Sequence, residues 1–172
     1  MKNKYDIIII GAGPAGIFTA IELVKSQSNY EILMIDKGRT LSKRNCPSRN
    51  SGKCVGCEPC SITFGWSGAG AFSDGKLSLS PEVGGNIVDY MGDQKAKELI
   101  AYADSIYLSF GAQSEVHGLN NKAIEDVKYE ASKHNIKLIP CPVRHLGTEK
   151  AFFVLQGMYD YLIKNKKLNF QK

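Results

Sequence analysis

The chain has 172 residues and a formal net charge of +5, and 43% of its residues are apolar. This composition is ordinary for a globular domain with a real core. The basic residues do not alternate with aromatic ones as in nucleic-acid-binding surfaces, and no apolar run fits a membrane span or a signal peptide. We therefore expect a cytoplasmic protein that binds neither nucleic acid nor membranes.

A short β-branched run at residues 5–10 predicts a buried strand, and the helical spacing of apolar residues predicts a helix over Pro14–Lys25. The turn between them follows a G-x-G-x-x-G pattern and comprises Gly11, Ala12, Gly13, Pro14, Ala15 and Gly16. Here Gly11 permits a sharp turn, Gly13 leaves room for a pyrophosphate, and Gly16 allows close packing of the helix on the strand. The N–H groups at the start of the helix would face the phosphates.

A second strand, residues 31–35, is expected to end at Asp36. An acidic side chain about 20 residues beyond the glycines is the expected acceptor for ribose hydroxyl groups. Lys37 follows it, so a negatively charged cofactor or substrate would pass close to a cation. The sequence therefore predicts a βαβ unit that binds a dinucleotide.

The next segment, residues 40–52, has little periodicity and is expected to be an extended loop. A cluster of cysteines with the spacing C-x7-C-x2-C-x2-C overlaps its end: Cys46, Cys54, Cys57 and Cys60. Two-residue spacers allow thiolates to converge on one centre, as in zinc and iron–sulfur sites. Three interpretations stay open, namely an iron–sulfur cluster, a structural zinc ion, or free or redox-active thiols.

A second glycine-rich stretch follows at residues 64–77. Its exposed N–H groups and small side chains would let it lie against a phosphate or an aromatic ring system. A flexible linker is the alternative, although the interspersed Phe64, Trp66, Phe72 and Leu77 are unlike linker composition.

The remaining chain is predicted to be largely helical. Residues 80–92 are expected to form a loop, followed by a helix that Asp93 caps and that reaches about Phe110. The other expected elements are a helix over 122–134 that buries Ile124, Val127 and Ala131, a strand over 137–141, and a helix over 149–164 that Thr148 caps. The last helix would bury Ala151, Val154, Leu155, Met158, Tyr161 and Leu162. A new strand is expected to begin near Leu168.

Two further residues are candidates for catalysis. Arg144 and His145 stand between a predicted strand and a helix N-terminus, where they could steer an anionic substrate or move a proton. A solvent-exposed pair without a catalytic role is the alternative. Cys141 is expected to be a small buried apolar residue.

The motifs together resemble a family of bacterial FAD-dependent dehydrogenases, which are NAD(P)/FAD-dependent oxidoreductases related to the glutathione-reductase-like flavoproteins. The resemblance is carried by GAGPAG at residues 11–16, by Asp-Lys-Gly at 36–38 and by GAGAFSDGKL at 68–77. The segment KCVGCEPC at 53–60 resembles the cysteine-bearing branch of that family, and residues 142–150 also resemble a family segment.

The resemblance implies a Rossmann-like FAD-binding unit over residues 1–79 and the start of a helical α+β substrate domain over 80–172. FAD would be bound in an extended form, with its pyrophosphate at the first glycine turn and its adenosine ribose at Asp36. The residues near the pyrophosphate and the flavin would be Gly68, Ala69, Gly70, Ser73, Asp74, Gly75 and Lys76. NAD(P)H is the electron donor that the family suggests, and the small-molecule substrate is not specified.

Enzymes of this type run to several hundred residues, so the chain is expected to correspond to their N-terminal portion. A complementary C-terminal half or an electron-transfer partner would then complete the site. Two alternatives remain, namely a dehydrogenase that uses only NAD(P) and a non-catalytic metal-binding or redox-sensing module on a Rossmann scaffold.

Overall fold

The computed structural model describes residues 4–26 and 29–172. The chain divides into two compact units, one formed by Met1–Ser73 with Ala151–Lys172 and the other by Asp74–Lys150. This division differs from the expected boundary at residue 79, because the last helix and strand return to the first unit.

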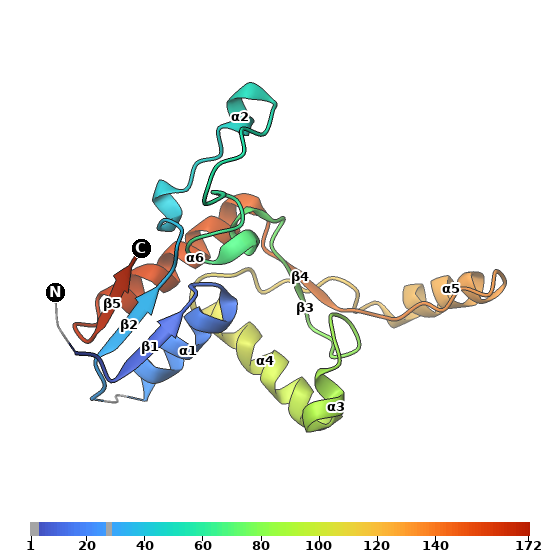
Figure 1. Ribbon diagram of the computed structural model, residues 1–172. Coiled ribbons are helices and arrows are strands. Elements are labelled where there is room, and N and C mark those ends of the chain that lie inside the picture. Colours follow the sequence, from blue (N-terminus) through green and yellow to red (C-terminus); the bar gives the residue numbers. More distant parts are fainter. Residues whose placement is uncertain (1–3, 27–28) are drawn as a thin grey trace. The chain divides into compact units, whose positions relative to one another are not determined.

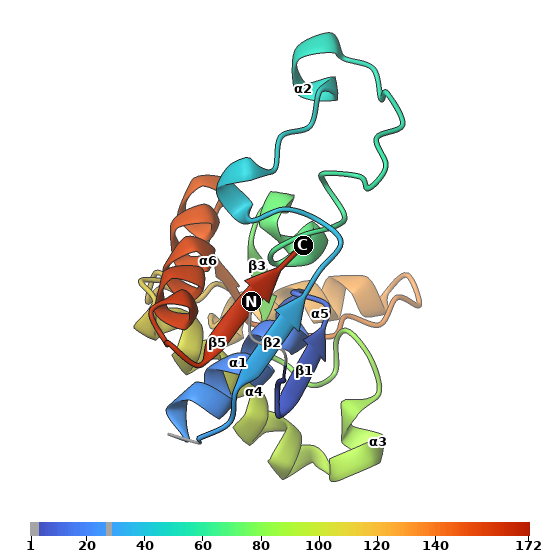
Figure 2. The same ribbon diagram turned by 60° about the vertical axis from the view of Figure 1, so that its left-hand side comes forward.

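The first unit contains a parallel sheet of three strands in the order β1-β2-β5. These strands are β1 (Ile7–Ile10), β2 (Ile32–Ile35) and β5 (Leu168–Gln171), and Figures 1 and 2 show them side by side. Their β-branched and apolar composition suits a buried parallel sheet. The α/β Rossmann-like prediction is confirmed, as is the strand expected near Leu168.

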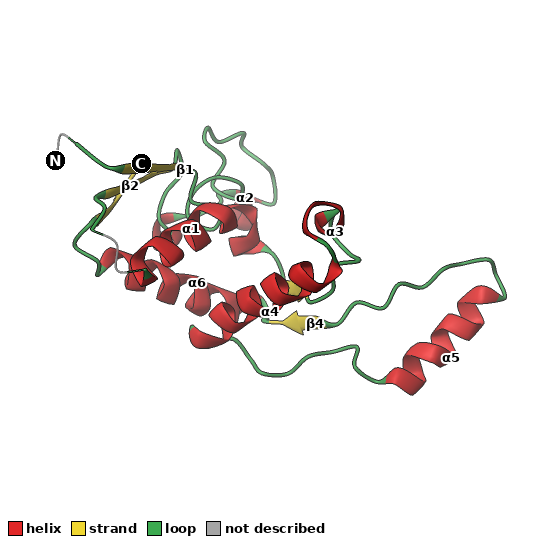
Figure 3. Cartoon of the chain, turned by 90° about the horizontal axis from the view of Figure 1, so that it is seen from below, coloured by secondary structure: helices red, strands yellow, loops and turns green. Residues whose placement is uncertain are grey.

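Helices α1 (Pro14–Lys25) and α6 (Thr148–Ile163) pack on the same face of this sheet. Ile9 of β1 lies beside Gly16 of α1, and Phe170 of β5 stacks edge-on against Tyr159 of α6. Residues 9 and 170 are in register with Met34 and therefore point to one face of the sheet. Figure 3 shows α1 and α6 together on one side of the sheet. The prediction for α1 is confirmed at both ends.

The apolar face predicted for α6 is confirmed except at Tyr161, which is exposed. The helix buries Ala151, Val154, Leu155, Met158 and Leu162. Thr148 is the first residue of the helix rather than the residue that precedes it. The helical spacing of these apolar residues therefore predicts the buried face, while the start of the helix moves by one residue.

Trp66 lies in the core of the first unit with 0% of its surface exposed. Its indole N–H donates to the Leu155 carbonyl oxygen at 3.0 Å, so its polar atom is satisfied. Its ring packs edge-on against Tyr159 and Phe170, with centroid separations of 5.0 and 5.9 Å. The glycine-rich stretch is thus anchored in the core and is not a flexible linker.

The loop predicted for residues 40–52 contains two short helical turns, η1 (Leu41–Lys43) and α2 (Ser48–Ser51). A third short turn, η2 (Gly68–Phe72), forms within the glycine-rich stretch. These turns have three to five residues each, which is too short to leave a periodic pattern in the sequence.

The second unit is built on a two-stranded antiparallel ribbon, in which β3 (Lys76–Ser78) pairs with β4 (Val143–His145). The strand predicted over 137–141 is wrong. Those residues have no regular structure, and the strand begins at Val143 because the pairing partner, Ser78, lies opposite it. Short strands are specified by such pairing more than by local composition.

Helices α3 (Ile87–Met91), α4 (Asp93–Ser109) and α5 (Asn121–Ser132) complete the second unit. Helix α3 lies inside the segment expected to be a loop. The residue before α4 is Gly92, and Asp93 lies in the first turn, where its carboxylate accepts from Lys97 at 2.6 Å. The predicted Asp93 cap is therefore wrong, although an acid in the first turn still favours the helix.

Helix α5 differs most from its prediction, because none of its residues is buried. Val127 is 54% exposed, although it was expected to face a core. Figure 3 shows α5 between two long loop segments. The helix itself is formed as expected, and its N-terminus is capped, because the Asn120 side chain accepts from the Ala123 N–H at 3.1 Å.

A buried ion pair connects β4 to α4 within the second unit. Arg144 is 4% exposed, and its Nε and Nη2 donate to the two carboxylate oxygens of Asp104 at 2.6 and 2.7 Å. Its Nη1 donates to the carbonyl of Gln113 at 2.6 Å. Hydrogen bonds from the guanidinium to Asp104 raise the pKa of Arg144.

We predict that Asp104→Asn destabilises the protein by about 3–5 kcal/mol, because it leaves a buried guanidinium without its counter-charge. Lys97→Met is the matched control, since it removes an exposed ion pair of the same helix and should cost less than about 1 kcal/mol. Urea unfolding followed by circular dichroism measures both. Equal effects of the two substitutions would contradict the structural role of Asp104.

Candidate functional site

The glycine turn between β1 and α1 has the geometry that a dinucleotide requires. Gly11 has a φ of +100°, which side chains rarely tolerate. A Cβ on Gly16 would overlap the carbonyl oxygen of Gly11, whereas a Cβ on Gly13 would meet nothing within 4 Å. Gly16 therefore allows the helix to approach the turn, and Gly13 borders open space that a phosphate could enter.

The N-terminus of α1 is suited to bind an anion. Its N-cap residue, Gly13, has no side chain to accept from the first N–H groups, Pro14 starts the helix, and the first turn carries no acidic residue. Backbone N–H groups and the positive end of the helix dipole therefore face outward beside Gly13. These features fit the phosphates of a dinucleotide.

Asp36 follows β2 and joins two backbone segments. Its Oδ2 accepts from the Ala12 N–H at 2.9 Å, and its Oδ1 accepts from the Gly38 N–H at 2.7 Å. A carboxylate has about four acceptor positions, so two N–H groups leave capacity for ribose hydroxyls. Lys37 points elsewhere, with its ammonium 3.5 Å from the centroid of the Phe64 ring.

The second glycine segment lies directly against this turn. The Ser67 N–H donates to the Ala12 carbonyl at 2.7 Å, and a Cβ on Gly68 would lie 4.0 Å from the Cα of Gly13. Ala69 and Gly70 continue into η2, and the Ser73 hydroxyl closes that turn on the Gly70 carbonyl at 3.0 Å. Two motifs whose contacting residues, Ala12 and Ser67, are 55 positions apart in the sequence thus meet at one place.

Gly38 and Gly65 are required for this arrangement. A Cβ on Gly38 would overlap the backbone of Gly65, and a Cβ on Gly65 would overlap that of Arg39. The segments after β2 and before η2 therefore pack backbone against backbone. The sequence indicated a glycine-rich loop here, but not which glycines are sterically required.

The other three predicted residues of this motif, Asp74, Gly75 and Lys76, lie in the second unit. The Lys76 ammonium is 2.7 Å from Asp74 Oδ2, and this hydrogen bond lowers the pKa of the Asp74 carboxyl. The Gly75 carbonyl accepts from the Leu146 N–H at 2.9 Å. In the structure these residues organise the start of β3.

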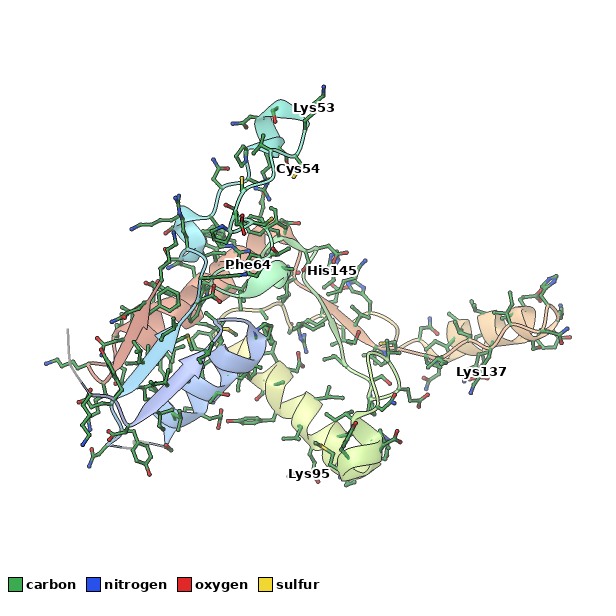
Figure 4. The ribbon with its side chains drawn as sticks, viewed as in Figure 1. Lys53, Cys54, Phe64, Lys95, Lys137 and His145 are labelled. Carbon is green, nitrogen blue, oxygen red and sulfur yellow. The ribbon has the colours of Figure 1, made fainter. Side chains whose placement is uncertain are left out.

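The predicted metal site is not formed by the four cysteines. Among the residues that the structure describes, no group of three or more His, Cys, Asp or Glu side chains is placed to hold a metal ion. Cys54 and Cys57 are exposed, whereas Cys46 and Cys60 are half-buried, and all four thiols are free. Figure 4 shows Lys53 and Cys54 at the tip of the loop and Phe64 at its base.

Cys46 and Cys60 each face local hydrogen-bond donors instead. The Cys46 sulfur lies 3.0 Å from the Ser48 hydroxyl, and hydrogen bonds from Ser48 lower the pKa of the Cys46 thiol. Backbone N–H groups of Ile62 and Thr63 lower the pKa of the Cys60 thiol. Both thiols are therefore more acidic than an ordinary cysteine.

Cys60 and Cys57 also line a cavity of about 290 Å³ in the first unit. Gly38, Arg39, Arg44 and Phe64 form part of its wall, so it opens beside the segment that follows Asp36. Cys141 of the second unit is half-buried, rather than fully buried as the sequence predicts.

The two candidate catalytic residues have different environments. Arg144 is engaged in the ion pair with Asp104 described above. His145 is exposed and lines a depression with Gln113 and Thr148, so its imidazole is accessible to a ligand. Of the two, only His145 has a side chain that is accessible from solvent.

Arg44 was not among the predicted site residues, yet it is buried next to the second glycine segment. A single arginine in an irregular loop is usually exposed, so the sequence carried no signal for it. Trp66 did carry one, because a tryptophan among glycines indicates an anchored loop rather than a linker.

Comparison with known proteins gives the same type of domain. A family model described as pyridine nucleotide-disulphide oxidoreductase matches residues 5–142. An uncharacterized protein of Clostridium beijerinckii is 37% identical over 73 residues, which are 41% of this chain and 13% of that protein. An uncharacterized protein of Methanosarcina barkeri is 57% identical over 35 residues, which are 20% of this chain and 8% of that protein.

The matched regions are thus a small part of both relatives. The structure contains, within its described residues, no helix with the length and apolar character to cross a membrane.

We predict different outcomes for substitutions at two glycines of the first turn. Gly16→Ala should destabilise the protein by about 1–3 kcal/mol because its Cβ overlaps Gly11. Gly13→Ala should change stability by less than about 1 kcal/mol but weaken dinucleotide binding about tenfold, because its Cβ enters the phosphate space. Urea unfolding and ligand titration of each variant separate the two roles. A Gly13→Ala variant that binds like wild type would contradict this placement of the phosphates.

We also predict that Cys46 and Cys60 react with iodoacetamide at lower pH than a free cysteine does. Their lowered pKa values mean that the thiolate is already populated below the usual range, and the rate rises as pH passes through each pKa. Mass spectrometry of peptides after timed alkylation measures each site. Alkylation curves that match N-acetylcysteine at both sites would show that the donors do not stabilise these thiolates.

Proposed function

The chain belongs to the pyridine nucleotide-disulphide oxidoreductase family, and we propose that it forms the dinucleotide-binding part of an FAD-dependent oxidoreductase. The observation that carries this proposal is the contact between Ser67 and Ala12, which brings the second glycine segment against the turn at Gly13. A single glycine turn is shared by many nucleotide-binding proteins, whereas two apposed glycine segments leave space along an extended dinucleotide.

Each residue of this site has a proposed role. The N–H groups that open α1 hold the pyrophosphate, Gly13 admits it, and Asp36 accepts from the adenosine ribose. Residues Gly68–Gly70 lie along the path from the pyrophosphate toward the flavin. FAD, when bound, supplies the group that accepts a hydride or an electron pair, and the protein supplies position and electrostatics.

His145 is the proposed proton carrier of the candidate pair, since its side chain is the accessible one. Its neighbours Gln113 and Thr148 offer hydrogen-bonding groups to a small-molecule substrate. NAD(P)H is the proposed electron donor. The thiols of five free cysteines suit a reducing compartment, so we propose a cytoplasmic location.

We further propose that another polypeptide segment completes the site, as a complementary C-terminal half or an electron-transfer partner. Ile8 and Ile10 are 56% and 86% exposed on the sheet face opposite α1. Parallel sheets are normally covered on both faces, so these two side chains favour additional structure over β1.

Two alternative functions predict different ligands. A dehydrogenase that uses only NAD(P) would employ the same glycine turn but would not need the second glycine segment. A metal-binding or redox-sensing module would depend on the cysteines, which the structure does not gather around one centre.

We predict that the purified protein binds FAD saturably and at least tenfold more tightly than NAD⁺. Quenching of flavin fluorescence measures FAD, and equilibrium dialysis measures NAD⁺. Equal or tighter binding of NAD⁺ would favour the NAD(P)-only alternative. Stoichiometric iron or zinc without uptake of either nucleotide would favour the metal-binding module and contradict the proposal.

A further inference from the structure

Arg44 is 6% exposed, and the hydrogen-bond partners of its guanidinium are backbone carbonyl oxygens. Nε donates to Ser61 at 2.9 Å, and Nη2 donates to Ile62 at 2.6 Å. Nη1 donates to Trp66 at 2.5 Å and to Gly68 at 2.8 Å. The Arg44 side chain therefore binds carbonyl groups of the residues that directly follow Cys60 and of the second glycine segment.

The two carbonyls bound by Nη1 flank a strained residue. Ser67 lies between Trp66 and Gly68 and has a φ of +66° although it is not glycine. A left-handed conformation at a non-glycine residue is strained and persists only when its surroundings enforce it. The Arg44 guanidinium binds the carbonyl oxygens of both Trp66 and Gly68, so these two carbonyls point toward the same group. The left-handed turn at Ser67 brings them into this orientation.

The strained residue is also the one that reaches the nucleotide turn. The Ser67 N–H donates to Ala12 at 2.7 Å, and Gly68 is the neighbour of Gly13. Hydrogen bonds from a charged donor are stronger than those between neutral groups. Loss of the guanidinium would release the Ser67 turn and, with it, the contact to Ala12.

The guanidinium also interacts with Asp36, with Cys60 and with the Phe72 ring. Burial lowers the pKa of Arg44, while the negative charges of Asp36 and Cys60 oppose this shift. Its Cζ also lies 4.7 Å from the centroid of the Phe72 ring, at the far end of η2. Arg49 lies over the same ring at 4.9 Å but is exposed on the outside.

We propose that Arg44 is a positioning residue for the cofactor. It holds Ser67 in its left-handed turn and thereby keeps the second glycine segment against the Gly13 turn, where FAD binds. The proposal rests on the proposed function for its ligand, whereas its geometric part concerns the protein without ligand. Because Arg44 also donates to the Ser61 and Ile62 carbonyls, the position of the second glycine segment depends on the loop that carries Cys60.

The first test uses the protein without cofactor. Trp66 is the chain's single tryptophan, so its fluorescence reports on this segment alone. Arg44→Met should expose Trp66 to acrylamide and shift its emission to the red, while far-ultraviolet circular dichroism stays unchanged. Arg49→Met is the matched control and should leave Trp66 shielded.

The second test measures the cofactor. Arg44→Met should weaken FAD binding at least tenfold, and flavin bound at saturation should lose the vibronic structure of its visible band. Added guanidinium ion should restore part of the affinity to Arg44→Met and none to Gly13→Ala. Ser67→Gly, which removes the strain, should recover part of the loss in the double variant.

The outcomes separate this proposal from the function it rests on. If wild type takes up no FAD, the proposed function fails. The role of Arg44 is then still decided by the shielding of Trp66 from acrylamide in Arg44→Met and by the recovery of that shielding when Ser67→Gly is added. If Arg44→Met does not fold, Arg44→Lys replaces it, because lysine keeps the charge but cannot reproduce the bidentate fork. Wild-type shielding of Trp66 together with FAD affinity within twofold of wild type would overturn the proposal.

Discussion

The carboxylate of Asp36 holds together the loops at the carboxyl ends of β1 and β2, and the arrangement of the first unit depends on this interaction. It accepts from the Ala12 N–H in the turn after β1 and from the Gly38 N–H in the segment after β2. The carboxyl ends of two parallel strands are thereby joined by one side chain. Because Ala12 also accepts from Ser67, the second glycine segment is attached to the same point. A dinucleotide site at the end of a parallel sheet requires this convergence of loops.

The sequence predicted this convergence in part. Some of its features are local, so that a short stretch of residues defines each of them. These features are the steric requirements of Gly11 and Gly16, the helix over Pro14–Lys25 and the acid at position 36. The long-range contacts are different in kind. Nothing in the sequence around Arg44 distinguishes a buried cation from a solvated one, because its partners are carbonyl groups present at every residue.

Fewer structural features of the second unit can be predicted from the sequence, because long-range contacts decide them. Helix α5 has a good N-cap and an amphipathic pattern, yet it buries no residue, since amphipathicity predicts a face and not the existence of a partner for it. The strand at Val143–His145 was misplaced because pairing with Lys76–Ser78 decides its position. Likewise, the cysteine spacing suits a metal centre, but Cys46 accepts hydrogen bonds from Ser48, Cys60 accepts them from the Ile62 and Thr63 backbone, and Cys54 and Cys57 are exposed.

We propose that FAD lies between the Gly11–Gly16 turn and the segment at Ser67–Gly70. A crystal structure of the protein with FAD tests it most directly. We expect the pyrophosphate at the N-terminus of α1, with ribose hydroxyls within hydrogen-bonding distance of Asp36. FAD bound elsewhere, with the Ser67–Ala12 contact intact and no ligand beside Gly13, would contradict the claim.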